Sequence, residues 1–178
     1  MELEERVAEL ERRIAALEKP GADAGGRAGD GDFWALEGFK EQLGSWGAED
    51  GGVLFTGAVR LPTGERWEWQ QAALTDGQLG PAEDSAQQSE EGTQRIADGL
   101  AALGHPVRIR LLRAVLAGRR TAADLSALDG IGTTGQIYHH LRQLSAAGWL
   151  TTTGRGRYAV PGTRVVPLLT ILAASQPP

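Results

Sequence analysis

The chain has 178 residues, of which 41% are hydrophobic, and a formal net charge of −5, so it can bury one sizeable core and an accessory element. It has no cysteine, which excludes disulfides, thiolate metal sites and cysteine nucleophiles. The first segment is too charged for a signal peptide, and the apolar tract 165–174 is about half the roughly 20 residues that a membrane-spanning helix needs. We therefore expect a cytoplasmic protein without a membrane segment.

Charge is divided unevenly along the chain. Residues 1–92 carry 8 basic and 20 acidic side chains, whereas residues 93–178 carry 10 basic and 3 acidic ones. A basic segment in an acidic chain is typical of a module that binds a polyanion. The alternative is chance surface charge, but the scarcity of acidic residues after residue 92 favours a polyanionic partner.

Residues 1–18 have a heptad pattern, with apolar residues at successive spacings of 4, 3, 4 and 3. Branched residues at the a positions and Leu at the d positions favour a parallel two-stranded coiled coil. In such a homodimer, Arg6 and Arg13 face Glu11 and Glu18 of the partner chain. The alternative is an amphipathic helix that packs on its own domain. The predicted dimerisation residues are Leu3, Val7, Leu10, Ile14 and Leu17.

Residues 19–32 are rich in Gly and Asp and nearly free of large apolar residues, which predicts a flexible linker. The linker separates the coil from a small module at residues 33–80. This module begins with a helix, which is predicted by the helical spacing of Leu36, Phe39, Leu43 and Trp46.

A β-hairpin is predicted to complete the 33–80 module. The three-residue turn 62–64, with Gly64 in the left-handed conformation, sets a register in which residue 59 pairs with 67 and residue 57 with 69. One interpretation of the resulting aromatic face is an effector pocket or a partner surface. The favoured alternative is a packed face that buries the hairpin against the preceding helix. The residues of this face are Phe55, Val59, Trp67 and Trp69.

The basic region, residues 81–178, reads as a series of helices followed by a short hairpin. A polar stretch leads into a helix with Ile96, Leu100 and Leu103 that ends at Gly104, and the next helix has Pro106 in its first turn. A capping box of Thr121 and Asp124 starts a short third helix, a fourth helix spans 133–147, and two strands form a hairpin at 149–160. This order predicts a winged helix-turn-helix within a mainly α fold with small β elements (α+β).

The helix 133–147 contains adjacent histidines, which raises the question of a metal site. At about 100° per residue, Ile137, Leu141 and Leu144 form the buried stripe, so His139 points away from the core and His140 lies at the stripe's edge. Two histidines that diverge in this way cannot bind one metal together, and we expect no metal site. As the recognition helix in the major groove, this segment would contact double-stranded DNA, with the wing on the backbone. The expected DNA-contacting residues are Thr133, Thr134, Gly135, Gln136, Tyr138, His139 and Arg142, with Arg155 and Arg157 in the wing and Arg119 and Arg120 before the helix-turn-helix.

The stretches LAALGHPVRIRLLRAVLAG and IYHHLRQLSAAGWL resemble the ArsR-like bacterial winged-helix regulators over about residues 93–175. In that family a Leu-x-His/Asp-Pro-x-Arg-x-x-Leu-Leu stretch precedes the helix-turn-helix. The resemblance implies a dimeric transcriptional repressor of the prokaryotic cytoplasm, associated with the nucleoid and often released by an effector. It implies nothing about residues 1–92.

The chain also departs from that family. Its metal-sensing members use cysteines, or His, Asp and Glu on the final helix, whereas this chain has no cysteine and its segment 162–175 has no acid or histidine. Metal sensing at those positions is therefore not expected. Tyr138 stands where family members usually carry a small residue. Pro167 is expected in the first turn of the final helix, whose apolar residues could bury against a second subunit or on their own core: Val166, Leu169 and Leu172.

Three alternatives stand beside a regulator that binds DNA alone. The histidines at 105, 139 and 140 lie in no nucleophile, phosphate-loop or metal motif, so we expect neither an enzyme nor a cofactor. A winged helix that binds another protein is the second alternative, but arginines in the wing and before the helix-turn-helix suit phosphates better. A third alternative is a ligand-sensing regulator with a small-molecule effector site in the 33–80 module.

Overall fold

The computed structural model describes residues 33–80, 86, 88–154 and 156–176. The coil residues Leu3, Val7, Leu10, Ile14 and Leu17, the linker 19–32 and Arg155 of the wing lie outside the described residues. The chain divides into two compact units, 1–41 and 42–178. The helix expected from the spacing of Leu36, Phe39, Leu43 and Trp46 is present as α2 (Trp34–Trp46), which begins in the first unit.

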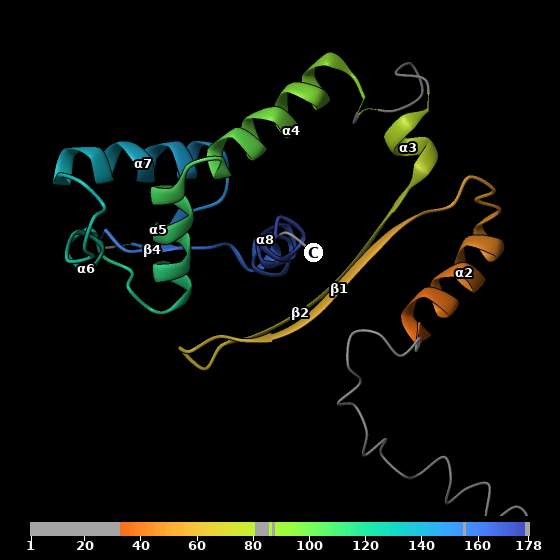
Figure 1. Cartoon of the computed structure of the whole chain (residues 1–178), viewed down its shortest axis with the longest axis horizontal. Helices are drawn as coiled ribbons and strands as arrows, with labels where there is room; N and C mark the ends of the chain where they lie inside the picture. The colour runs from red at the N-terminus through yellow and green to blue at the C-terminus, as the bar shows by residue number, and fades with distance from the viewer. Residues whose placement is uncertain (1–32, 81–85, 87, 155, 177–178) are drawn as a thin grey trace, which may run out of the picture. The chain divides into compact units, whose positions relative to one another are not determined.

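Within 42–178 the fold is mixed α+β, which confirms the class expected from the sequence (Figure 1). The hairpin consists of β1 (Gly52–Arg60) and β2 (Arg66–Leu74), which pair with Val59 opposite Trp67 and Gly57 opposite Trp69. Gly64 has a φ of 89°, so a residue without a side chain is needed where the turn closes. The predicted turn and register are both confirmed. A short helix, α3 (Thr75–Leu79), follows β2.

The aromatic face of the hairpin packs on α8 (Gly162–Ala174), beside which both strands run in Figure 1. The approach is close enough to exclude side chains at two positions. A Cβ on Gly57 would lie 2.7 Å from Cγ1 of Val166, and one on Gly162 would lie 2.5 Å from Cη2 of Trp67. The sequence favoured the preceding helix as the cover of this face, but α8 is the helix that packs on it. The hairpin therefore shares a core with helices that the sequence assigned to a separate domain.

The helices of the basic region begin and end close to the predicted positions. These helices are α4 (Glu90–Leu103), α5 (Pro106–Leu116), α6 (Ala122–Ser126) and α7 (Thr134–Ala146). The capping box of Thr121 and Asp124 is present at the start of α6. The fully buried side chains of this region come from α5, α6, α7 and α8: Leu111, Leu112, Val115, Leu125, Ile137, Leu141, Leu144, Val165, Val166 and Leu168.

Two side chains hold α4 to the rest of the core. Arg108 donates to the backbone carbonyls of Ala101 and Ala102 at the end of α4, and to Oε1 of Gln143 on α7. The indole N–H of Trp149 donates to the carbonyl of Gly99 at 2.9 Å. Arg108 therefore bonds two carbonyls at the end of α4, of which that of Ala101 also accepts from the N–H of Gly104, and it fixes α4 against α7.

The chain ends with a short hairpin and the last helix. The strands β3 (Thr151–Thr152) and β4 (Tyr158–Ala159) are antiparallel, and Tyr158 pairs with Thr152. The expectation that Pro167 occupies the first turn of the last helix is wrong, because α8 begins at Gly162 with Pro161 as its N-cap. Pro167 lies inside the helix, where its missing N–H leaves the carbonyl of the exposed Thr163 to solvent. No helix in the described part of the chain is long and apolar enough to cross a membrane.

Candidate nucleic-acid interface

The α7 helix has one buried and one exposed face. Ile137, Leu141 and Leu144 are at most 1% exposed, which confirms the predicted stripe. The opposite face carries side chains of the kind that contact DNA, and Tyr138 on it is 48% exposed although it is aromatic. The exposed candidates on α7 are Thr134, Gly135, Gln136, Tyr138, His139 and Arg142. An uninterrupted polar face on a helix held by three core residues is what a major-groove reader requires.

The start of α7 is held by a second capping box. Thr133 Oγ1 accepts from the backbone N–H of Gln136, while Oε1 of Gln136 accepts from the backbone N–H of Thr133 at 2.8 Å. A Gln136 side chain that bound an adenine base through both its amide oxygen and its amide nitrogen would have to break the hydrogen bond between Oε1 and the N–H of Thr133. The geometry therefore assigns Thr133 and Gln136 to the positioning of α7, whereas Tyr138, His139 and Arg142 are exposed on this helix and take no part in the cap.

The two adjacent histidines have different surroundings. His139 is exposed, whereas the ring of His140 is half-buried with its centroid 4.6 Å from that of His105. The Nδ1 of His105 caps α5 by accepting from the N–H of Val107 at 3.2 Å. Burial lowers the pKa of His140, and electrostatic repulsion from the neighbouring His105, Arg108 and His139 lowers it further. His140 is therefore a neutral packing residue near physiological pH, and His139 is the member of the pair that faces solvent.

The lowered pKa of His140 predicts a pH-dependent stability. Above the unfolded-state pKa of about 6.5, the ring is neutral in both states and adds no penalty. As the pH falls below this value the unfolded chain takes up the proton first, so the free energy of unfolding should decrease between about pH 7.5 and about pH 5.5. In urea titrations His140→Gln should lose less stability over this range than the wild type. His139→Gln is the matched control, and the same pH dependence in both variants would contradict the assignment.

The arginines expected to contact phosphates fall into two groups. Arg119 and Arg157 are exposed. Arg120 is half-buried, and its Nη2 donates to both carboxylate oxygens of Glu65 at 2.8 Å. The hydrogen bond from Arg120 holds the pKa of Glu65 below its usual value. Arg120, which is expected to contact phosphate, is therefore engaged by Glu65 through one of its nitrogens, and its side chain joins the tip of β1–β2 to the segment before α6.

The backbone around Arg120 also joins the base of the β3–β4 hairpin. The N–H of Tyr158 donates to the carbonyl of Arg120 at 2.7 Å, and Thr121 forms an antiparallel bridge with Arg157. Arg110 on α5 donates to the carbonyls of Asp129 and Gly130, which holds the turn before α7. Both hairpins therefore contact the segment at Arg120 and Thr121, directly before α6. Arg108 and Glu65 were missed as positioning residues. Arg108 is the arginine of the Pro-x-Arg part of the family motif, and this position was a signal for its role. No feature of the sequence around Glu65 indicated that it would pair with Arg120.

The residues expected to form a dimer contact or an effector pocket pack largely within their own chain. Val166 is buried against the hairpin of its own chain, so its assignment to a subunit interface is wrong. Leu169 and Leu172 are partly buried against the same core. Of the four aromatic-face residues, which are all half-buried, Val59 and Trp67 pack on the core. Trp67 also lines a cavity of about 320 Å³.

No family model and no curated protein sequence matches the chain. The features that bear on its function are the exposed face of α7, the arginines around it and the elements that position them.

Proposed function

We propose that residues 88–176 form a winged helix-turn-helix that binds double-stranded DNA and acts as a transcriptional regulator. The α6 and α7 helices are the helix-turn-helix, α7 is the recognition helix, and β3–β4 is the wing. The observation that carries the proposal is the exposed face of α7, with Tyr138, His139 and Arg142 opposite a fully buried stripe. The order of α5, α6, α7 and the small hairpin supports it, as does the excess of basic residues after residue 92.

The resemblance to ArsR-like regulators makes a homodimeric repressor the specific form of this proposal. An apolar surface that a second copy could cover is present on α4, where Ile96 and Leu100 are 52% and 53% exposed. These side chains line a hollow of about 380 Å³ together with Trp149, Arg164 and Ile171. Burying this surface against a second copy would remove apolar area from water and place two recognition helices on one duplex.

Selection of binding sites from random DNA duplexes by the purified full chain tests the proposal. A regulator of this kind should enrich an inverted repeat whose half-sites are about one helical turn apart, or a multiple of it, because two copies read equivalent half-sites. Recovery of a single half-site would support DNA binding and contradict the dimer. If no sequence is enriched and the chain binds no DNA at low salt, the proposal fails.

Replacing Arg142 with alanine should weaken binding to the selected site and to random DNA to a similar degree. If Arg142 contacts a phosphate, the slope of log K against log salt should flatten by about one unit. Fluorescence anisotropy at several salt concentrations measures both quantities.

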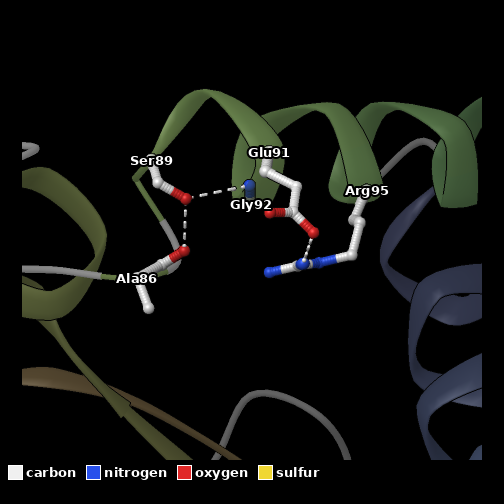
Figure 2. Close-up of polar contacts among 5 residues, drawn as sticks. All are labelled: Ala86, Ser89, Glu91, Gly92 and Arg95. Carbon is white, nitrogen blue, oxygen red and sulfur yellow. Dashed lines mark hydrogen bonds and ion pairs between the residues drawn. The ribbon is translucent and has the colours of Figure 1, made fainter.

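Arg95→Ala is the matched control for Arg142→Ala, because it also removes one exposed positive charge from a helix. Arg95 lies on α4, whose N-cap is Ser89. Its Nη1 lies 2.7 Å from Oε1 of Glu91, one turn earlier in the helix (Figure 2). Its replacement should leave the salt slope unchanged. Equal losses in the two variants would mean that net charge, and not the face of α7, governs binding.

A further inference from the structure

A cavity of about 320 Å³ lies where the tip of the long hairpin meets the base of the small one. Its apolar wall is drawn from the turn after β1, the end of α5 and the approach to α8: Leu61, Val115, Leu116, Val160 and Val165. The indole of Trp67 forms another wall. This volume is at the lower end of the range for small-molecule sites, so it suits a ligand built on a single ring system.

Trp67 on the cavity wall carries a polar atom that the described part of the chain leaves without a partner. The indole nitrogen Nε1 of Trp67 is buried and has no acceptor among the described residues. Because a buried N–H without an acceptor is unfavourable, an occupant that accepts this hydrogen bond would satisfy a donor that these residues leave unpaired. Thr151 and Thr153 add hydroxyl groups to the lining from the wing side.

Arg120 lines the same cavity beside its ion-pair partner Glu65. Its guanidinium carries five N–H donors, and Glu65 engages those of Nη2. The remaining donors on Nε and Nη1 can each donate a hydrogen bond to one oxygen of a second carboxylate. An apolar wall, an indole N–H and a guanidinium together select a flat apolar body with an acidic group.

We propose that this cavity binds a small aromatic carboxylate, with the ring against Trp67 and the acid on Arg120. Such a ligand would contact the β1–β2 tip and the base of β3–β4 together. The backbone carbonyl of Arg120 accepts from the N–H of Tyr158 in β4, so a ligand held by Arg120 would affect the position of the wing. The effect on DNA rests on the proposed function, whereas ligand binding does not.

Calorimetric titration of the full chain with benzoate, phenylacetate and indole-3-acetate, each against its neutral amide, tests the site. At least one carboxylate should bind once per chain at concentrations up to about 10 mM, and about tenfold or more tighter than its amide. Arg120→Gln should abolish this preference for the acid. Absence of binding by all three carboxylates, or equal binding of acids and amides, would overturn the proposal.

A matched pair of variants locates the ligand. Trp67→Phe keeps an aromatic wall but removes the N–H, and should weaken binding by about 3- to 10-fold. Trp69→Phe is the control. Trp69 lies on the same strand, but its indole N–H already donates to Oε1 of Gln71 at 3.4 Å. Equal affinities in the two variants would place the ligand elsewhere.

A second measurement covers the case in which Trp67→Phe does not fold. The indole N–H resonance that moves on titration of the wild type should also be the one that broadens or shifts in Arg120→Gln. If no indole resonance moves, the site is wrong.

The proposed effect of the ligand on DNA binding has a separate test. Saturating carboxylate should change the affinity for the selected DNA site by about fivefold or more, as a coupling of ordinary size does. Unchanged affinity with a bound ligand would overturn the coupling to the wing and leave the site standing. If DNA selection itself fails, the titrations still decide the ligand site.

Discussion

Replacing Trp149 with alanine is expected to lower the free energy of unfolding of the 42–178 unit by about 3–5 kcal/mol, the usual cost of deleting a buried tryptophan. The side chain is 3% exposed and lies directly after α7. Its N–H reaches the carbonyl of Gly99 on α4, and the guanidinium of Arg164 on α8 lies 4.9 Å above its ring. Three helices therefore lose a shared contact. Urea denaturation followed by circular dichroism measures the loss.

Trp149→Phe is the control that separates packing from hydrogen bonding. Phenylalanine keeps most of the buried apolar surface but leaves the carbonyl of Gly99 without the indole donor. The expected loss is about 1–2 kcal/mol. If the alanine variant is no less stable than the phenylalanine variant, Trp149 does not fill the space between these helices.

Replacing Gly162 with alanine is expected to destabilise the same unit by about 1–3 kcal/mol, because the added methyl group overlaps a rigid ring. The new Cβ would lie 2.5 Å from Cη2 and 2.9 Å from Cε3 of Trp67. The hairpin or the start of α8 must move to admit it, and the cavity lined by both residues would change shape. Thermal and urea unfolding should show the loss.

Gly99→Ala is the matched control, since Gly99 lies within α4 and a Cβ there meets no atom within 4 Å. This variant should gain about 0.5–1 kcal/mol from the better helix propensity of alanine. A double-mutant cycle with Trp67→Leu adds a second check. The double variant should lose less stability than the sum of the two single variants, because the smaller side chain makes room for the methyl group. Simple additivity would contradict the proposed overlap.

Much of the candidate interface could be predicted because its signals are local. The phase of α7 follows from three apolar residues within eight positions, and this phase also separated His139 from His140. The roles of the arginines were harder to predict. Arg120 has the charge and position of a phosphate ligand, but its partner Glu65 lies 55 residues earlier in the chain. Sequence spacing cannot show which distant carboxylate reaches a given guanidinium.

The sequence by itself determined the elements whose hydrogen bonds close within a few residues: the capping box at Thr121, the turn at Gly64 and the register of the long hairpin. Only the tertiary structure decided that α8 covers this hairpin, because an apolar face carries no information about which other apolar face will meet it. The fit between Gly57 and Val166, and between Trp67 and Gly162, joins residues about a hundred positions apart. The same long-range packing created the cavity at Arg120 and buried Val166 within its own chain. These features depend on shape complementarity between complete elements, which exists only after the chain has folded.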